Sequence, residues 1–231
     1  MRRFWTDVTI DAVEAGFAIR LDGKPVRLPG GAPLAVPHQA LASAIAGEWR
    51  AANATIIPDD LPLTQLAGAA IEQIAPDPDA LRRNLLAYGS TDLLCYRAET
   101  PAALAALQHE KWQPWLDWAN NRLGARLVTT RGIIAVTQSD AALRCLAGAL
   151  ASQDEWALAG LGVAVPALGS LVLGLATIAG AMTPETAHDL ARLDEIWQEA
   201  TWGADAEAQA RRNGIARDIA SAAMFVTLTR S

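Results

Sequence analysis

Histidine and cysteine are the residues in this chain whose side chains most readily bind metals or act as catalytic groups. The chain has three histidines and two cysteines, and all of them lie far apart in the sequence. A zinc site needs three or four ligands at short spacings, as in C-x-x-C or H-E-x-x-H, and neither motif occurs. We therefore predict no metal site. Because the two cysteines lie far apart, we also predict that they are buried thiols in a reducing compartment. The residues concerned are His38, His109, His188, Cys95 and Cys145.

Two glycine-containing segments come close to nucleotide-binding motifs without completing them. Gly23-Lys24 is followed by Pro25, where a P-loop requires a serine or threonine. The segment that begins at Gly160 has Val165 where the dinucleotide-binding fingerprint requires its third glycine. The sequence therefore predicts no catalytic residue and no cofactor.

The composition is that of a folded, acidic protein. Of its 231 residues, 52% are hydrophobic and 19% are charged, which is close to the globular norm. The formal net charge of -6 argues against a nucleic-acid partner, because binding to phosphates requires a basic face. We therefore exclude nucleic acid as a partner.

One apolar stretch, residues 156–184, has no charged residue and is long enough to cross a bilayer. Several glycines interrupt it, and its flanks carry Asp154, Glu155 and Glu185 instead of the basic residues that fix membrane topology. We therefore predict a buried central helix that begins at Pro166, without stable membrane insertion.

The first third of the chain has the pattern of strands and turns. Apolar residues alternate with polar ones around residues 8–10 and 17–21, and the Asp22-Gly23 pair that follows is typical of a tight hairpin. From His38 the period changes to that of an amphipathic helix. We predict an α+β N-terminal domain over residues 1–78, which ends in the proline-containing segment APDPDA.

Helical patterns dominate the remainder. Helix starts are indicated at Thr100-Pro101, Ser139-Asp140 and Thr183-Pro184, and the helix from Pro184 is expected to end near Gly203. A last helix is expected over residues 205–228. The exception is the β-branched segment 126–138, for which we predict a hairpin, either here or in the N-terminal sheet. The fold class is α+β: a small antiparallel β-rich N-terminal domain with a helix, then a larger all-α helical bundle over residues 79–231.

The negative charge is concentrated in residues 185–207. This window has a single basic residue, Arg192, and accounts for the whole net charge. On the helix that we expect there, a stripe of Leu190, Leu193 and Trp197 faces the core, and acids lie broadly opposite. They form either an ordinary solvated face or a patch that orients a basic partner. The acids opposite the stripe are Glu185, Asp189, Glu195 and Glu199, and the other acids of the window are Asp194, Asp205 and Glu207.

The chain also has eight tryptophans, three of them at three-residue steps: Trp112, Trp115 and Trp118. Tryptophans fill cores and also anchor protein interfaces, and we favour the core.

Several motifs together resemble the assembly chaperones of the F-type ATP synthase that bind the alpha subunit of its catalytic head. In chain order they are RFW, AIRLDGKPVRLP, LASAIAGEW, IIPDDLPLTQLA, YGSTDLLCYRA, WQPWLDW, SLVLGLA and EIWQEATWGADAE.

The resemblance implies a chaperone and not an enzyme. It implies that the protein covers the beta-contact surface of the free alpha subunit until the alpha-beta hexamer forms, and that it belongs to the bacterial cytoplasm. We expect the protein to be a monomer when free. The family's C-terminal signature lies in the acidic window, so the expected partner-binding residues are Glu195, Gln198, Glu199, Trp202, Asp205 and Glu207. The expected structural residues of the family motifs are Trp49, Asp92 and Trp115. The alternative left open is a small-molecule enzyme with a carboxylate pair, for instance Asp92 with a neighbouring acid.

Overall fold

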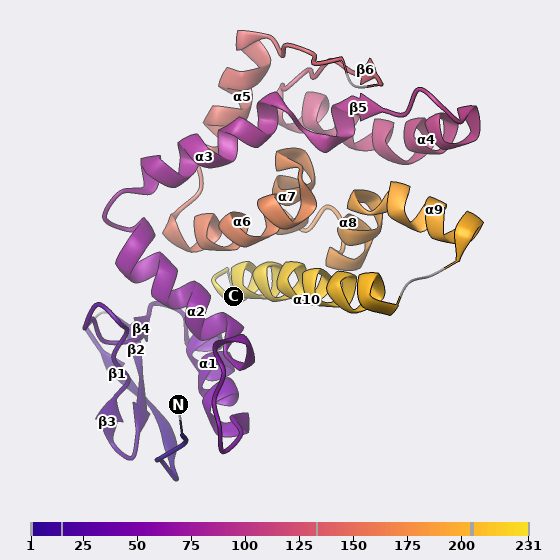
Figure 1. Cartoon of the computed structure of the whole chain (residues 1–231). Coiled ribbons are helices and arrows are strands. Elements are labelled where there is room, and N and C mark those ends of the chain that lie inside the picture. The colour runs from indigo at the N-terminus through magenta and orange to yellow at the C-terminus, as the bar shows by residue number, and fades with distance from the viewer. Residues whose placement is uncertain (1, 15, 133, 204–205, 231) are drawn as a thin grey trace. The chain divides into compact units, whose positions relative to one another are not determined.

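The computed structural model describes residues 2–14, 16–132, 134–203 and 206–230, and for residues 201, 202 and 206 it describes the backbone alone. A small β-sheet near the N-terminus is followed by a long series of helices (Figure 1), so the predicted α+β fold is confirmed. The chain packs into two compact units. Unit 1 consists of Met1–Pro78, Asp154–Gly160 and Ser221–Ser231, and unit 2 of Asp79–Gln153 and Leu161–Ala220. The division into folding domains at residues 78 and 79 stays a prediction.

The elements of the structure, in chain order, are β1 (Val8–Val13), β2 (Gly16–Leu21), β3 (Lys24–Pro25), β4 (Ala35–Val36), α1 (Gln39–Ala51), η1 (Pro58–Asp60), α2 (Pro62–Ala69), η2 (Ala70–Ile74), α3 (Pro78–Ser90), η3 (Leu93–Cys95), β5 (Tyr96–Arg97), α4 (Ala102–Trp118), η4 (Ala119–Leu123), β6 (Thr130–Arg131), α5 (Asp140–Ala151), α6 (Glu155–Leu168), α7 (Leu171–Ile178), α8 (Pro184–Ala191), α9 (Leu193–Trp202) and α10 (Ala206–Leu228). Here η1 and η3 are short 3-10 helices, whereas η2 and η4 are π-helical turns that continue α2 and α4.

The N-terminal sheet is antiparallel and is built around β2. Strands β1, β3 and β4 all pair with β2, and the register of the first pair joins Val8 to Leu21. Asp22 and Gly23 connect β2 to β3 with φ angles of 47° and 77°. These left-handed values are the ones that a tight two-residue hairpin requires, so the predicted hairpin is confirmed.

Trp49 lies in the core of unit 1 and connects α1 with α2. Its indole N–H donates to Thr64 Oγ1 at 3.1 Å, and its ring lies 5.0 Å from that of Trp5, centroid to centroid. The adjacent Glu48 carboxylate accepts hydrogen bonds from Leu63 N at 2.6 Å and Thr64 N at 3.0 Å, which are first-turn groups of α2. Because the first amides of a helix lack partners within the helix, Glu48 stabilises α2 from α1.

Helix α7 is the buried centre of unit 2. All its residues are buried, and Ser170 caps its start by accepting from Leu173 N. The backbone passes so close to α6 that a Cβ on Gly174 would lie 2.5 Å from Val165 Cγ2. A buried apolar helix is therefore confirmed, but its predicted start is wrong. Pro166 lies inside α6, where burial of the neighbouring apolar side chains offsets the lost hydrogen bond.

Two other predicted helix boundaries are wrong. Helix α4 begins one residue later than predicted, with Pro101 at the N-cap instead of Thr100. The helix that starts at Pro184, correctly capped by Thr183, ends at Ala191. A separate helix, α9, then covers the rest of the run that we expected to be continuous. The helices predicted after Ser139 and toward residue 228 are both present, as α5 and α10.

The hairpin predicted over residues 126–138 is wrong. Thr130 and Arg131 form β6, which pairs in parallel with β5, so the segment belongs to unit 2 and not to the N-terminal sheet. The buried Gln138 side chain holds the start of the segment, because it accepts from Val128 N at 2.8 Å and donates to Val128 O at 2.9 Å. A polar side chain thus replaces the cross-strand ladder that we expected.

Within the described residues, no helix is long and apolar enough to span a membrane. The uncharged stretch 156–184 is divided between α6 and α7, with a break at Gly169 and Ser170. Cys95 is buried and Cys145 is half-buried, and both are free thiols. Burial, followed by the nearby Asp92 charge, raises the pKa of the Cys95 thiol to about 12, so this cysteine is unreactive at neutral pH.

Candidate functional site

The region that we predicted to bind a partner is formed by α9 and the residues that follow it. Helix α9 starts immediately after Arg192, whose guanidinium donates to Ala167 O at 2.9 Å and to Glu195 Oε1 at 3.2 Å. The first contact attaches the start of α9 to the C-terminal end of α6. The Arg192 side chain therefore fixes the break between α8 and α9, so α9 does not simply continue α8.

Asp194 is half-buried and forms a hydrogen bond within the protein. Its Oδ1 accepts from Gln108 Nε2 at 2.8 Å, and Gln108 is 1% exposed. Gln108 Oε1 in turn accepts from Ala98 N at 2.6 Å. Buried polar groups require such partners, so this chain of contacts attaches α9 to α4 and to the residue after β5.

Glu199 does not belong to the exposed face on which we placed it. Its carboxylate lies 2.6 Å from Arg212 Nη2, and the two side chains are 24% and 5% exposed. Gln209 Oε1 accepts from the same nitrogen at 2.7 Å. Glu199 thus neutralises a buried arginine of α10, and this interaction holds α9 against α10.

The exposed residues of α9 are a smaller set than predicted. Glu195 has 46% of its side chain exposed, Gln198 is exposed, and the apolar Ile196 is 41% exposed. Glu207, at the start of α10, is also exposed. Of the other predicted partner-binding residues, the Trp202 side chain and all of Asp205 lie outside the described residues.

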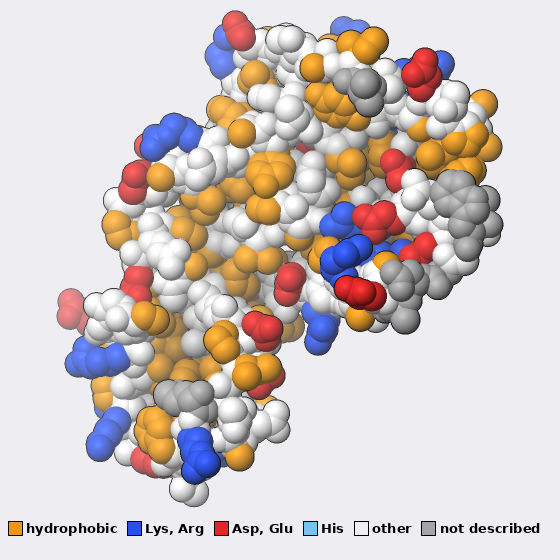
Figure 2. All heavy atoms as spheres, in the orientation of Figure 1, with side chains coloured by type: hydrophobic (Ala, Val, Ile, Leu, Met, Phe, Trp, Pro, Cys, Tyr) orange, Lys and Arg blue, Asp and Glu red, His pale blue; other side chains and the backbone are white. Residues whose placement is uncertain are grey.

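Figure 2 shows that acidic and arginine side chains are interspersed over α9 and the start of α10, with apolar side chains close by. The acidic window of the sequence is therefore not a uniformly negative surface. Arginines of α10 and Arg192 offset part of its charge, as the Glu199–Arg212 and Glu195–Arg192 pairs demonstrate.

Replacing Glu199 with glutamine is expected to lower the free energy of unfolding by about 2 kcal/mol, because it leaves the buried Arg212 without its charge partner. The same change at Glu195 is the matched control. It is expected to cost less than about 0.5 kcal/mol, since Glu195 is 46% exposed and Arg192 keeps its hydrogen bond to Ala167 O. Urea denaturation followed by circular dichroism measures both changes. Equal losses of unfolding free energy in the two variants would contradict a stabilising role of the Glu199–Arg212 pair.

Asp92 is completely buried and serves as a cap. Its carboxylate accepts from Leu94 N at 3.1 Å, Ser170 Oγ at 2.7 Å and Val172 N at 3.0 Å. These donors belong to the first residues of η3 and α7, so one side chain joins the starts of two helical segments. Burial raises the pKa of Asp92 to about 6 despite the hydrogen bonds.

The carboxylate-pair enzyme is not supported by this environment. Among the described residues, the groups that bind Asp92 are backbone amides and one hydroxyl. Asp92 lines neither the pocket beside Arg97 and His109 nor the one beside Leu127 and Ala142. No three His, Cys, Asp or Glu side chains in the described part of the chain are grouped closely enough to hold a metal ion. The arrangement at Asp92 can stabilise a helix junction, but it offers no substrate access.

The tryptophans of α4 divide between the core and its edge. Trp112 is 1% exposed, and its indole N–H donates to Leu190 O at 2.9 Å, whereas Trp115 and Trp118 are half-buried. The guanidinium carbon of Arg97 lies 5.3 Å from the centroid of the Trp112 ring, a cation-π contact. Trp112 thus joins α4 to α8, in accordance with the core interpretation.

Comparison with known proteins now decides the family. The family model described as ATP12 chaperone protein matches residues 2–120, which is more than half of the chain. The chain belongs to this family. The family resemblance predicted from the sequence motifs is therefore confirmed, and so is the prediction of a chaperone and not an enzyme.

Individual proteins that are similar to the chain agree with this assignment. The mitochondrial protein atp12 of Schizosaccharomyces pombe is 29% identical over 214 residues, which cover 87% of this chain and 74% of the relative. The crystal structure of Atp12 from Paracoccus denitrificans is similar with a TM-score of 0.94 at 45% identity, over 99% of this chain and 98% of that one. Atu1473 from Agrobacterium tumefaciens, described as a putative chaperone, has a TM-score of 0.94 at 40% identity over 100% and 86% of the two chains.

Several residues that organise this ATP12-family structure were missed in the sequence. Arg97, Gln108 and Arg212 are buried polar groups whose partners are distant in sequence or on another element. Ser170 was also missed, although it lies directly before an apolar run, which is the position of an N-cap. A serine at this position would have predicted the start of α7. The three buried polar residues had no comparable local signal.

Proposed function

We propose that this chain is an assembly chaperone of the F-type ATP synthase that binds the free alpha subunit and covers its beta-contact surface until the alpha-beta hexamer forms. We further propose that it acts as a monomer in the bacterial cytoplasm. Membership in the ATP12 chaperone family supports the proposal. Uncovered apolar interfaces promote aggregation, so a subunit that awaits its partner benefits from such a protein.

The contact surface that we propose is the exposed side of α9 together with Glu207. The observation that carries it is the combination on one short helix of an exposed apolar residue, Ile196, with the exposed polar residues Glu195 and Gln198. Apolar contacts at the centre of an interface supply affinity, and charges around them supply orientation. Glu199 and Asp194 hold α9 in place and are not expected to touch the partner.

Reversal of charge at Glu195 is expected to weaken capture of the alpha subunit about tenfold or more, because like charges across an interface cost several kcal/mol. Stability is expected to change by less than about 1 kcal/mol, since Glu195 is exposed and only loosely paired. The measurement is co-purification of Glu195→Lys with separately expressed alpha and beta subunits, together with a thermal melt.

Glu14→Lys makes the same charge change at an exposed residue of unit 1 and is the matched control. Capture of beta in preference to alpha would contradict the proposed partner. Equal loss of alpha with both variants would contradict the proposed surface, since it would reflect net charge alone.

A further inference from the structure

A small pocket of unit 2 has an unusually cationic lining. It has a volume of about 240 Å³ and lies between the two-stranded sheet of β5 and β6 and the adjacent face of α4. Drug-sized ligands occupy pockets of about 300 to 1,000 Å³, so this one is suited to a small group. The lining includes two arginines, a histidine, a glutamine and two threonines, and no acidic residue lines it: Arg97, His109, Gln113, Thr129, Thr130 and Arg131.

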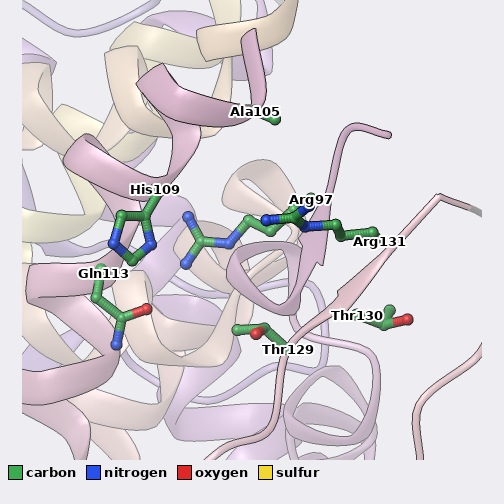
Figure 3. Close-up of a pocket in the computed structure, with 7 residues that line it drawn as sticks. All are labelled: Arg97, Ala105, His109, Gln113, Thr129, Thr130 and Arg131. Atoms are coloured by element: carbon green, nitrogen blue, oxygen red, sulfur yellow. The ribbon is translucent and has the colours of Figure 1, made fainter. Parts of the chain in front are cut away.

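Arg97 brings an incompletely satisfied positive charge to this pocket. It is 7% exposed, and one terminal nitrogen, Nη1, donates to Gln108 O. The other, Nη2, is buried and has no hydrogen-bond partner among the described residues. Figure 3 shows the Arg97 side chain directed toward His109. Burial lowers the pKa of Arg97, which means that its charged form is penalised in the absence of an anion.

Arg131 places a second positive charge beside the first. Arg97 and Arg131 are directly paired in the parallel register of β5 and β6. Like charges on paired positions of neighbouring strands repel each other, and this sheet has only two residue pairs to offset the cost. An anion bound between the two guanidinium groups would attract both of them and offset their mutual repulsion.

Two acidic side chains, Asp117 and Glu99, lie close to pocket residues or to their chain neighbours. Asp117 Oδ1 accepts from Gln113 Nε2 at 2.9 Å, and a Cβ added to Gly132 would lie 3.0 Å from Glu99 Oε2, so the Glu99 carboxylate rests against that glycine. Neither acid lines the pocket. The charge inside therefore remains positive.

We propose that this pocket binds a single small oxyanion, a carboxylate or a phosphate group, between Arg97 and Arg131. The planar donor fork of arginine fits both groups, and charge-assisted hydrogen bonds of this kind are strong. His109 and the Thr129 hydroxyl provide further donors, whereas the Thr130 side chain points away from the two arginines (Figure 3). The site lies within unit 2 and does not depend on the partner proposed for α9.

The test is a titration of the ¹⁵N-labelled full chain, followed by NMR at constant ionic strength maintained with sodium chloride. One arm uses inorganic phosphate, and the other uses N-acetyl-glutamate N-methylamide, which presents one side-chain carboxylate as a polypeptide does. Saturable shifts are expected in the backbone amides of Arg97 and of residues 129–131. With Arg131→Gln, the affinity is expected to fall about fivefold or more, because one charged donor is lost.

Arg144→Gln is the matched control, since Arg144 is an exposed arginine of α5 that lines neither described pocket. It is expected to bind like the original chain. Saturation by the capped glutamate identifies an acidic side chain of a polypeptide as a fitting ligand, and saturation by phosphate alone identifies a free oxyanion. Absence of saturable shifts in both arms, or the same affinity loss in both variants, would overturn the proposal.

Discussion

Replacing Trp112 with alanine is expected to lower the free energy of unfolding by about 3 to 5 kcal/mol. The side chain is 1% exposed, so its removal leaves a cavity in the centre of unit 2. The change also removes the hydrogen bond to Leu190 O and the ring beneath the Arg97 guanidinium. All three losses act in the same direction, because each leaves a buried group with fewer contacts. The measurement is urea denaturation followed by far-ultraviolet circular dichroism.

Two further variants separate the contributions at Trp112. Trp115→Ala makes the same substitution on the same helix at a half-buried position, and about half the effect is expected there. Trp112→Phe retains an aromatic ring but lacks the N–H group, and it is expected to cost about 1 to 2 kcal/mol. Equal destabilisation by the two alanine variants would contradict the central position that the structure gives to Trp112.

The stability contribution of Asp92 is expected to fall as the pH rises from 4 to 7. The ordinary pKa of 3.8 applies to the unfolded chain, whereas burial raises the pKa in the folded protein to about 6. Between these values the folded protein keeps a proton that the unfolded chain has lost, so a rise in pH favours unfolding. The contribution is complete below pH 3.8 and is lost as the pH passes through about 6. A shift of this size corresponds to about 3 kcal/mol.

The experiment compares the original chain with Asp92→Asn by urea denaturation at several pH values from 4 to 7.5. Subtracting the two curves removes the titration of other groups. The difference in unfolding free energy, original minus variant, is expected to decrease by about 3 kcal/mol over this range. Asp7→Asn makes the same substitution at an exposed aspartate of unit 1 and serves as the control. A difference for Asp92 that stays flat or increases would contradict the raised pKa.

The elements that could be predicted from sequence are those whose stabilising contacts are local. The Asp22-Gly23 turn closes a hairpin between residues adjacent to it, and Thr183 caps α8 through the amide three residues later. Such contacts recur wherever the same few residues occur in order, so composition and spacing indicate them. The family was also readable, because its motifs occur as an ordered set along the chain.

The candidate surface could be predicted only in part. The sequence located the acidic window, but periodicity assigned Glu195 and Glu199 to one exposed face. Glu199 instead pairs with Arg212, 13 residues away on another helix, and Asp194 binds Gln108, 86 residues away. A helical wheel cannot distinguish these acids, because the partner that buries each one belongs to a different element.

By itself, the sequence determined the α+β class, the local turns and caps, the family and the position of the negative charge. Tertiary structure decided which acidic side chains remain exposed and free to contact a partner. Their burial and pairing depend on segments that are distant in sequence but meet in space. Asp92 illustrates the division most clearly. Its hydrogen bond to Leu94 N is a local cap, whereas the contacts with Ser170 and Val172 join residues 78 and 80 positions away. Those distant contacts, together with burial, determine the pKa of Asp92, and they exist only after the chain has folded.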